Sequence, residues 1–350
     1  MPELSYILPL RWEDDAGLDE LTAYLRGLAR SCDEVIVVDG SASPLFERHA
    51  LAWHGLIVHI RPDPRFRFVM PKVDGVLTGV TEARNEMIVV ADDDVRYDEN
   101  GLARVAASLE DSDLVWPQNY FDPLPWHAVW DTGRTLLNRA FAHDYPGTVG
   151  VRSSALLACG GYDGDVMFEN LELRRTIEAA GGRIVTPLDL FVRRMPPSSG
   201  HFWSQRVRQA YDDLALPGRL AVFLAIVPGV AAGLLLRRLE PIVAGVLGTV
   251  ILAEVGRRRA GGAAVFPARA SLFAPAWVLE RAVTSWLAVW QRVAHGGVSY
   301  RGRRIKASAT SRRVLRERLA EVRLSGPTSA PGGSAPRDRA REPRRSTASL

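Results

Sequence analysis

The sequence predicts an α/β fold with a mostly parallel sheet and helices on both faces, followed by a C-terminal membrane helical region. Three observations carry this prediction. Short apolar runs alternate with helical patterns up to about residue 200, three adjacent carboxylates follow one of these runs, and two long apolar runs come after Arg219. Strands that alternate with helices form βαβ units, and their sheets bind ligands at the carboxyl ends of the strands.

The expected strands are short runs rich in branched and aromatic residues. They are Tyr6–Leu10, Glu34–Val38, Leu56–Ile60, Met87–Ala91 and Leu114–Trp116. A helical period of apolar residues predicts the intervening helices at Leu18–Arg30, Val73–Arg84 and Asn100–Leu109. Residues 1–215 are therefore expected to form one α/β domain.

Residues 216–305 are expected to associate with a membrane. Two apolar runs, at about 220–236 and 241–256, have nearly the minimum length for crossing a bilayer and predict a membrane hairpin. A pair of buried helices in a soluble protein and a re-entrant hairpin are the alternatives. The Arg257–Arg259 cluster and the absence of a basic n-region at the start both favour a cell-membrane protein with its α/β domain on the cytoplasmic side.

A third stretch and a basic tail follow this hairpin. Residues 266–290 combine many aromatics with Arg269, Glu280 and Arg281, which favours interfacial helices over a simple span. Residues 306–350 are polar and basic, so this tail is expected to be largely disordered. Its charges either contact anionic lipid head groups or are solvated.

The distribution of charge argues against binding to nucleic acid. Residues 301–350 carry 14 Lys and Arg against 4 Asp and Glu, whereas residues 1–300 carry 30 against 36. The basic character therefore belongs to the tail and not to the folded part.

An acidic triplet, Asp92-Asp93-Asp94, follows the fourth expected strand. Because alternate side chains on a strand point the same way, Asp92 and Asp94 are expected to converge on one point while Asp93 points elsewhere. Two converging carboxylates repel each other unless a cation lies between them, and Mg²⁺ or Mn²⁺ bridged to a phosphate is the usual solution. A solvated acidic turn is the alternative. Asp39 lies at the end of another expected strand, which favours a site.

The triplet is one of six motifs that occur in a fixed order. They are Tyr6-Ile7-Leu8-Pro9-Leu10-Arg11, Val38-Asp39-Gly40-Ser41, Pro71-Lys72 with Ala83-Arg84-Asn85, Asp92-Asp93-Asp94, Gly160-Gly161-Tyr162-Asp163 with Phe168-Glu169-Asn170, and Gln205-Arg206-Val207-Arg208-Gln209. Together they resemble the family 2 glycosyltransferases, inverting enzymes of GT-A fold. More narrowly, they resemble a membrane-attached bacterial branch related to ceramide glucosyltransferase-like and polysaccharide synthase enzymes. The resemblance covers roughly residues 4–215.

The resemblance implies a set of residues around a nucleotide-sugar donor. Asp92 and Asp94 would coordinate the metal on the donor diphosphate, which makes Mg²⁺ or Mn²⁺ the implied cofactor. The residues that would contact or lie near the donor are Pro9, Arg11, Asp39, Lys72, Arg84 and Asp93. The alternatives are an ordinary Asp-Gly turn at Asp39 and solvated helix charges at Lys72 and Arg84.

The acceptor side departs from the family's pattern. Asn170 stands where the family has an Asp that deprotonates the acceptor hydroxyl, and an amide cannot take up a proton near neutral pH. Glu169 is the nearest carboxylate, and Glu172 lies one helical turn further along. We hypothesise that Glu169 is the general base and that Asn170 orients the acceptor or its loop.

The last motif matches the family's Gln-x-x-Arg-Trp element at Gln205 and Arg208, whereas Gln209 replaces the Trp. By this resemblance Arg208 would bind a phosphate oxygen. The alternative is a basic helix beside the membrane that binds lipid head groups.

The sequence therefore predicts an inverting, metal-dependent glycosyltransferase that moves a sugar from a nucleotide-diphospho-sugar to a hydroxyl of a lipid or glycan acceptor at the membrane. An amphiphilic or lipid-linked acceptor is favoured because the domain is tethered. A sugar-phosphate nucleotidyltransferase and a catalytically silent, membrane-associated nucleotide-sugar-binding protein are the alternatives. The acidic loop after the first strand, Arg11-Trp12-Glu13-Asp14-Asp15, argues against the former.

Overall fold

The computed structural model describes residues 3–300 and 302–325. Its centre is a seven-stranded sheet made of β1 (Leu4–Leu10), β2 (Glu34–Asp39), β3 (Val58–Ile60), β4 (Met87–Ala91), β6 (Leu114–Val115), β8 (Thr148–Arg152) and β9 (Ile184–Val185). The strand order is β3-β2-β1-β4-β8-β6-β9. Only β8 runs antiparallel to its neighbours in this sheet. The predicted mostly parallel sheet is confirmed, with every predicted strand in place to within two residues.

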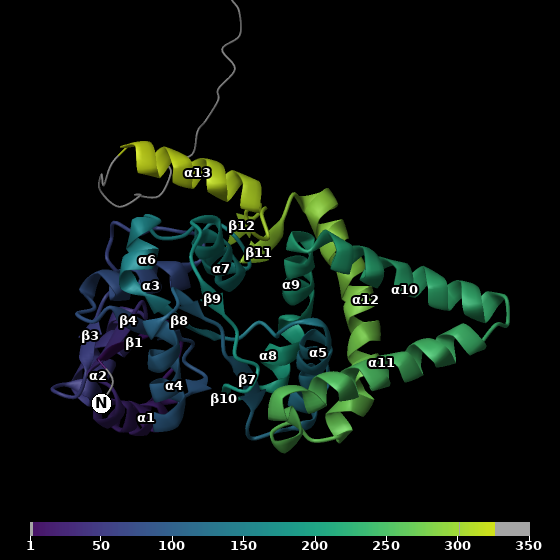
Figure 1. Cartoon of the computed structure of the whole chain (residues 1–350), viewed down its shortest axis with the longest axis horizontal. Helices are drawn as coiled ribbons and strands as arrows, with labels where there is room; N and C mark the ends of the chain where they lie inside the picture. Colours follow the sequence, from purple (N-terminus) through teal and green to yellow (C-terminus); the bar gives the residue numbers. More distant parts are fainter. Residues whose placement is uncertain (1–2, 301, 326–350) are drawn as a thin grey trace, which may run out of the picture.

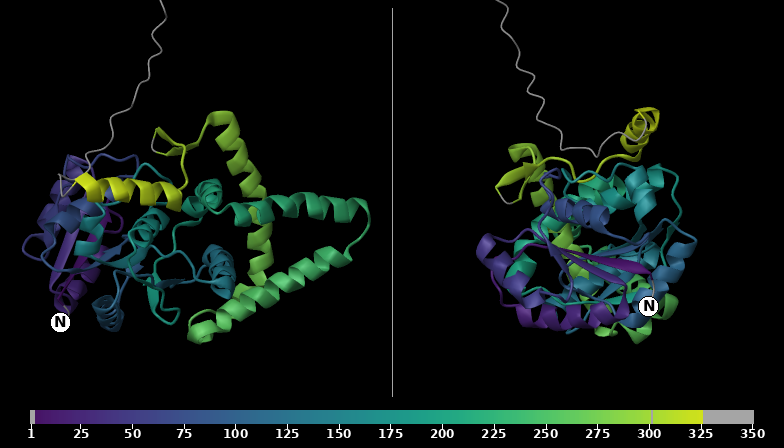
Figure 2. Two further views of the ribbon diagram at one scale, coloured as in Figure 1. Left: turned by 45° about the horizontal axis from the view of Figure 1, so that its top comes forward. Right: turned by 90° about the vertical axis from the view of Figure 1, so that its left-hand side faces the viewer.

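Helices cover both faces of the sheet (Figure 1, Figure 2). They are α1 (Leu18–Ser31), α2 (Ser43–Trp53), α3 (Pro71–Glu82), α4 (Glu99–Glu110), α6 (Ser153–Ala158) and α7 (Glu169–Ala179). Alternate residues of β1 supply the two layers of the core, since Tyr6 and Leu8 pack with α1 and α4 whereas Ile7 packs with α3. The two-sided arrangement expected from the sequence is thus confirmed.

The chain reverses its direction of travel across the sheet at β1. It adds β2 and β3 on one side of β1 and then β4 on the other, and such a switch point leaves a crevice at the carboxyl ends of the strands. Helix α3 lies close over β1 because Gly75 has no side chain, and a Cβ there would come within 2.8 Å of the Cβ of Pro9. The first turn of α3 therefore reaches the same edge as the crevice.

A second, smaller sheet lies beside this edge. It contains β5 (Val95–Arg96), β7 (Gln118–Phe121) and β10 (Phe191–Arg194), in the order β5-β10-β7. Strand β10 is antiparallel to β5, with Arg194 opposite Val95. Because β5 directly follows the acidic triplet, this pairing places Arg194 beside the three carboxylates.

The remaining helices form a bundle with a projecting hairpin. They are α5 (Trp126–Phe141), α8 (Ser199–Ser204), α9 (Arg206–Tyr211), η1 (Asp212–Ala215), α10 (Pro217–Leu235), α11 (Glu240–Arg258), η2 (Arg259–Ala264) and α12 (Arg269–His295). Helices α10 and α11 project from the body, join at a distant tip, and outline a triangle with α12 (Figure 1). Both predicted apolar runs are thus helical. Among the described residues, only α10 is long and apolar enough to cross a membrane, with a mean hydropathy of 1.9 and 11% of its window buried.

The base of the hairpin is fixed to α5. A Cβ at Gly256 of α11 would collide with the carbonyl oxygen of Leu136, so only glycine allows the two helices to come this close. The buried Arg139 donates to the carbonyl oxygens of Gly256 (3.3 Å) and Arg259 (2.7 Å), which closes the carboxyl end of α11. The hairpin base is therefore anchored in the body, while its tip is not.

Helix α12 forms most of the stretch over 266–290 for which interfacial helices were predicted, and its location at an interface stays a prediction. It packs along α5 and α9, and the charges that suggested an interface lie inside the protein. Glu280 forms a 2.5 Å ion pair with Arg206, and Arg281 lies 3.7 Å from Asp213. Apolar residues on the outer side of α12, such as Trp290, are nonetheless exposed.

The chain after α12 also differs from the prediction. It forms the hairpin of β11 (Val298–Tyr300) and β12 (Arg303–Ile305), followed by α13 (Arg312–Ser325). Leu315 and Leu319 of α13 are buried, and α13 packs against α7. The expectation of disorder over 306–350 is therefore wrong up to residue 325, because two apolar residues four positions apart give α13 a face to bury. The rest of that prediction falls on residues 326–350, outside those described.

Candidate active site

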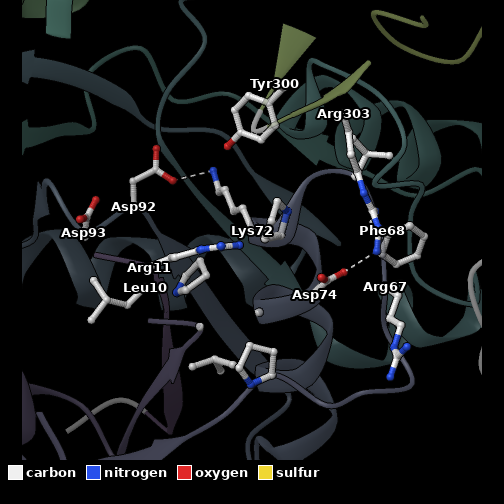
Figure 3. A pocket seen from close by; sticks show the side chains of 17 residues that line it. Leu10, Arg11, Arg67, Phe68, Lys72, Asp74, Asp92, Asp93, Tyr300 and Arg303 are labelled. Atoms are coloured by element: carbon white, nitrogen blue, oxygen red, sulfur yellow. Dashed lines mark hydrogen bonds and ion pairs between the residues drawn. The ribbon is translucent and has the colours of Figure 1, made fainter. Parts of the chain in front are cut away.

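Two adjoining cavities open at the carboxyl edge of the main sheet. The first, here called the strand cavity, has a volume of about 560 Å³ and lies at the ends of β1, β2 and β4 (Figure 3). Its lining consists of Pro9, Leu10, Arg11, Val38, Gly40, Pro62, Arg67, Phe68, Val69, Pro71, Lys72, Asp74, Gly75, Asp92, Asp93, Tyr300 and Arg303. It therefore contains four of the predicted donor residues, together with Asp92.

The second cavity, here called the helix cavity, has a volume of about 290 Å³ and lies between α5, α7, α9 and α12. Its polar and charged lining includes Lys72, Asp92, Arg134, Asn138, Glu169, Asn170, Arg194, Gln205, Arg208, Gln209, Asp212, Asp213, Arg219, Arg281 and Tyr300. Lys72, Asp92 and Tyr300 line both cavities. The predicted donor and acceptor motifs thus meet at these three residues.

Lys72 joins the two cavities electrostatically. Its Nζ lies 2.6 Å from Asp92 Oδ1 and 2.8 Å from Glu169 Oε1. Burial alone would lower the pKa of Lys72, but the charges of Asp92 and Glu169 outweigh it and raise that pKa. Lys72 is therefore a fixed cation, and Figure 3 shows it pointing at Asp92 across the mouth of the strand cavity.

The acidic triplet converges, but through a turn and not through strand alternation. The amide of Val95 donates to the carbonyl of Asp92 (3.0 Å), so the three carboxylates sit on a tight turn between β4 and β5. Arg194 forms ion pairs with two of them, with its Nε 2.9 Å from Asp94 and its Nη2 3.4 Å from Asp92. Burial is the main cause that raises the pKa of Asp94 to about 6.

Strand alternation predicted that Asp93 points away from the site, but the structure differs. It lines the strand cavity and accepts a hydrogen bond from the indole nitrogen of Trp12, whereas Asp94 lines neither cavity. The predicted metal pair of Asp92 and Asp94 thus shares one arginine, while Asp92 and Asp93 are the members that face open space.

These carboxylates fit a hard divalent cation. Asp94 Oδ1 is buried and has no hydrogen-bond partner among the described residues, so the turn holds an oxygen with unused coordination capacity. All the available donors are carboxylate oxygens, which Mg²⁺ and Mn²⁺ prefer over softer ligands. The triplet is therefore suited in chemistry to the predicted metal.

The structure places Asp39 outside both cavities. Its side chain is fully buried, where Oδ2 accepts from His49 (2.6 Å) and His59 (3.1 Å) and Oδ1 accepts from the amide of Ser41 (2.8 Å). Burial would raise the pKa of Asp39, but these hydrogen bonds hold it well below its usual range. Asp39 thus braces β2 against α2 and β3, and its neighbour Gly40 is the residue that lines the strand cavity. The predicted base contact is corrected accordingly.

Arg84 and Glu172 also lie away from the cavities. Arg84 pairs with Glu34 at 2.8 Å, at the amino end of β2 and hence at the opposite edge of the sheet from Asp92. Glu172 is fully buried and accepts from the amide of Thr310 (2.6 Å), so it holds the chain before α13 against α7. Both predictions are wrong because sequence spacing does not reveal that Arg84 follows the end of α3 that lies away from the crevice, or that Glu172 lies on a buried face of α7.

The last predicted motif does face the helix cavity. Arg208 donates to Gln205 Oε1 (2.5 Å) and its guanidinium lies 5.2 Å from the ring of Tyr300. Asn170 donates to the carbonyl of Pro146 (3.1 Å) and its Oδ1 lies 3.3 Å from Lys72 Nζ. Glu169, Asn170, Gln205 and Arg208 therefore surround one space, as the resemblance implied.

Three lining residues escaped the sequence analysis. Tyr300 and Arg303 reach the strand cavity from the β11–β12 hairpin (Figure 3), more than two hundred residues along the chain from Lys72. Asp212 lines the helix cavity, and its Oδ1 is buried with no hydrogen-bond partner among the described residues. Burial is the main cause that raises the pKa of Asp212 to about 8.

The sequence matches no protein-family model and no curated protein. The fold is similar in outline to mannosyltransferase PcManGT from Pyrobaculum calidifontis in complex with GDP-Man and Mn²⁺, at 17% identity and a TM-score of 0.46, over 81% of this chain and 87% of that one. It is also similar to glucosyl-3-phosphoglycerate synthase from Mycobacterium tuberculosis in complex with Mn²⁺, UDP and phosphoglyceric acid (14%, 0.39, 60% and 76%). A third is S. aureus TarS in complex with UDP-GlcNAc (16%, 0.40, 58% and 61%). These likenesses concern the outline of the fold, and the chemistry follows from the residues of the two cavities.

Proposed function

We propose that this protein is an inverting glycosyltransferase that moves a sugar from a nucleotide-diphospho-sugar to a hydroxyl of an acceptor at a membrane. The observation that carries the proposal is the junction of the two cavities, where Lys72 lies between Asp92 and Glu169. Such a junction would place the donor in one cavity and the acceptor in the other. Fixed charges would then lie beside the bond that breaks between the sugar and the diphosphate.

The strand cavity suits the donor. The nucleoside would lie at the ends of β1 and β2, against Pro9 and Gly40. Arg11, Lys72 and Arg303 line the same space and would bind the diphosphate by charge-assisted hydrogen bonds. This assignment uses the position that α/β sheets give their ligands, and it needs no contact from Asp39 or Arg84.

The acidic triplet would hold the proposed Mg²⁺ or Mn²⁺ through Asp92 with Asp93 or Asp94. A divalent ion bound there supplies a Lewis acid that stabilises the charge of the departing nucleoside diphosphate. The protein's own contribution is Lys72 and Arg194, which balance the carboxylates and keep them in place.

Two carboxylates of the helix cavity qualify as the general base. Glu169 remains the prediction from the sequence, and its ion pair with Lys72 fixes it at the junction. Asp212 is favoured by a separate observation, since its buried Oδ1 has no hydrogen-bond partner in the described part of the chain and burial raises its pKa to about 8. A base of that pKa is ionised in a fraction of molecules at neutral pH and accepts a proton more strongly than an ordinary carboxylate.

The membrane setting rests on the hairpin. Helix α10 has the length and composition of a span, and apolar side chains at the tip of the hairpin are exposed, among them Leu235 and Leu236. A domain tethered in this way meets acceptors that reside in or at the bilayer. The proposed location is the cell membrane, with the two cavities on the cytoplasmic side, as the arginines near the hairpin base favour.

The test is an assay with membranes that contain the full chain, a panel of radiolabelled nucleotide-diphospho-sugars, and Mg²⁺ or Mn²⁺. We expect label in the organic phase with one donor, and Asp92→Asn should reduce it about 100-fold. Asp111→Asn, on an exposed residue remote from both cavities, should leave transfer unchanged. Equal transfer by the Asp92 variant would refute the proposal, and donor binding without turnover would favour the silent binding protein.

A further inference from the structure

A large apolar cavity lies within the triangle of α10, α11 and α12. It has a volume of about 970 Å³ and is closed on the side of the body by α5. Its wall is mainly apolar, with Phe141 from α5, Ile226 from α10, Leu252 from α11, and Trp277 and Val278 from α12. This hairpin cavity exists because α10 and α11 diverge from their shared tip instead of packing together along their length (Figure 2).

The hairpin cavity adjoins the helix cavity. Asn138, Tyr145, Leu216 and Arg219 line both. Arg219 is held at this boundary because its Nη1 donates to Asn138 (3.0 Å) and its Nε lies 3.1 Å from Asp213. A ligand that fills the hairpin cavity can therefore extend past Arg219 into the space that contains Glu169 and Asp212.

The charged side chains that line the hairpin cavity are arginines, namely Arg175, Arg219 and Arg312. Arg219 pairs with Asp213 and Arg312 pairs with Glu178 at 3.1 Å, and both carboxylates lie outside the lining. Arg175 Nε is buried and has no hydrogen-bond partner among the described residues. A cationic rim on an apolar cavity complements a molecule that has an apolar chain and an anionic group at one end.

We propose that the hairpin cavity binds the apolar chain of the acceptor, an amphiphile whose chain is attached to a phosphate-type anionic head that lies by Arg219 and Arg312. The inference rests on the proposed function, because the shared wall with the helix cavity would bring the head to the transfer site. A docked protein helix or a second copy of the chain accounts for apolar contact, but not for this shared wall or for the arginines at the rim.

The experiment is photolabelling of the full chain in lipid nanodiscs with a diazirine-bearing dodecyl phosphate, followed by peptide mapping. We expect the label on the peptides that line the cavity from α5, α10 and α11. Labelling of the outward faces of α10 and α11 alone would overturn the proposal. The probe needs no nucleotide-sugar, so labelling can succeed where transfer fails, and the two proposals are tested separately.

Two matched pairs of variants sharpen the result. Leu252→Gln on the cavity wall should reduce labelling about tenfold, whereas Leu247→Gln, an exposed leucine of the same helix outside the cavity, should not. Arg312→Gln should weaken binding of the phosphate probe, and Arg313→Gln on the outer side of the same helix should have no effect. Equal effects within either pair would contradict the proposed location.

A chain-length series separates the amphiphile from other anions. Competition by octyl, decyl and dodecyl phosphate should strengthen about fourfold with each added methylene until the cavity is full. Inorganic phosphate should not compete at the same concentration. A series without dependence on chain length, or full competition by inorganic phosphate, would show that the cavity does not bind the chain.

Discussion

The fold shifts the pKa of Asp212 into the pH range where a titration can be measured on the native protein. Burial raises its pKa from 3.8 to about 8, so the native protein keeps a proton that the unfolded chain loses. Between about pH 4 and about pH 8, the titration of Asp212 therefore makes the free energy of unfolding fall as pH rises. Asp212→Asn removes the titration, so its stability relative to wild type should increase from about pH 4 to about pH 8, by at least about 1 kcal/mol.

Chemical unfolding of both proteins across this pH range measures the effect, and Asp111→Asn is the control because Asp111 is exposed. A stability difference that does not change with pH would contradict the native pKa. In the transfer assay the wild-type rate should rise toward pH 8 if Asp212 is the base, and the variant should lose this rise. Retention of the rise by Asp212→Asn, with its loss in Glu169→Gln, would assign the base to Glu169.

The predicted site residues that the structure brings together and those that it places apart differ in a physical way. Asp92 follows β4, and Lys72 and Glu169 lie in the first turns of α3 and α7, so the three residues meet at one edge of the sheet. The alternation of strands and helices indicates this edge. Asp39 and Arg84 belong to the same series of motifs, but their side chains bind elsewhere. Asp39 bonds to His49 and His59, and Arg84 pairs with Glu34. Tertiary packing determines these partners. No local pattern contains that information.

At the scale of elements, the β11–β12 hairpin completes the wall of the strand cavity. Arg303 lines the cavity, whereas its neighbour Arg304 does not and instead bonds the carbonyl of His295. Arg303→Gln should weaken binding of a nucleoside diphosphate about tenfold, because it removes one charge-assisted contact. Calorimetric titration with and without Mg²⁺ measures this.

Arg304→Gln is the matched control for Arg303 and should bind the nucleoside diphosphate as wild type does. Equal affinity of the two variants would show that the hairpin does not contact the donor. Sequence analysis assigned this segment to the membrane region, since two strands of three residues each are too short to give a periodic signal.

The contact of α11 with α5 is a second prediction at this scale. Gly256→Ala forces a Cβ against the carbonyl of Leu136 and should destabilise the protein by about 1–3 kcal/mol or more. Gly245→Ala and Gly248→Ala, on the same helix, meet no atom within 4 Å and should be neutral or stabilising by up to about 1 kcal/mol. Thermal unfolding compares the three, and equal effects would contradict the close approach of the helices.

For the whole molecule, the exposed tip of the hairpin predicts binding to lipid. Leu235, Leu236 and Leu239 are 84%, 69% and 54% exposed. Their replacement by Gln should abolish flotation with vesicles, since each leucine contributes about 1.5–3 kcal/mol when buried. Leu51→Gln on α2, where Leu51 is 81% exposed, should leave flotation unchanged. Flotation of the tip variant at the wild-type level would exclude the tip as the attachment.

The arrangement as a whole was predictable only in part. Periodicity located the α/β domain because each of its elements buries one regular face, and length and composition located α10 and α11. The sequence did not reveal the packing of α12, whose Glu280 pairs with Arg206 of α9 and whose Arg281 lies 3.7 Å from Asp213 of η1. A sequence pattern shows that a charge exists, but not that its partner is near.

The position of Tyr300 and Arg303 after the hairpin has a consequence for how the protein matures. A chain leaves the ribosome from its amino end, so the acidic triplet and Lys72 are synthesised before α10 and α11. The two residues that finish the strand cavity are synthesised later, after α12. Under the proposed function, a nascent chain would therefore reach the bilayer before its donor pocket is complete, and the order of synthesis would delay catalysis until the tether is in place.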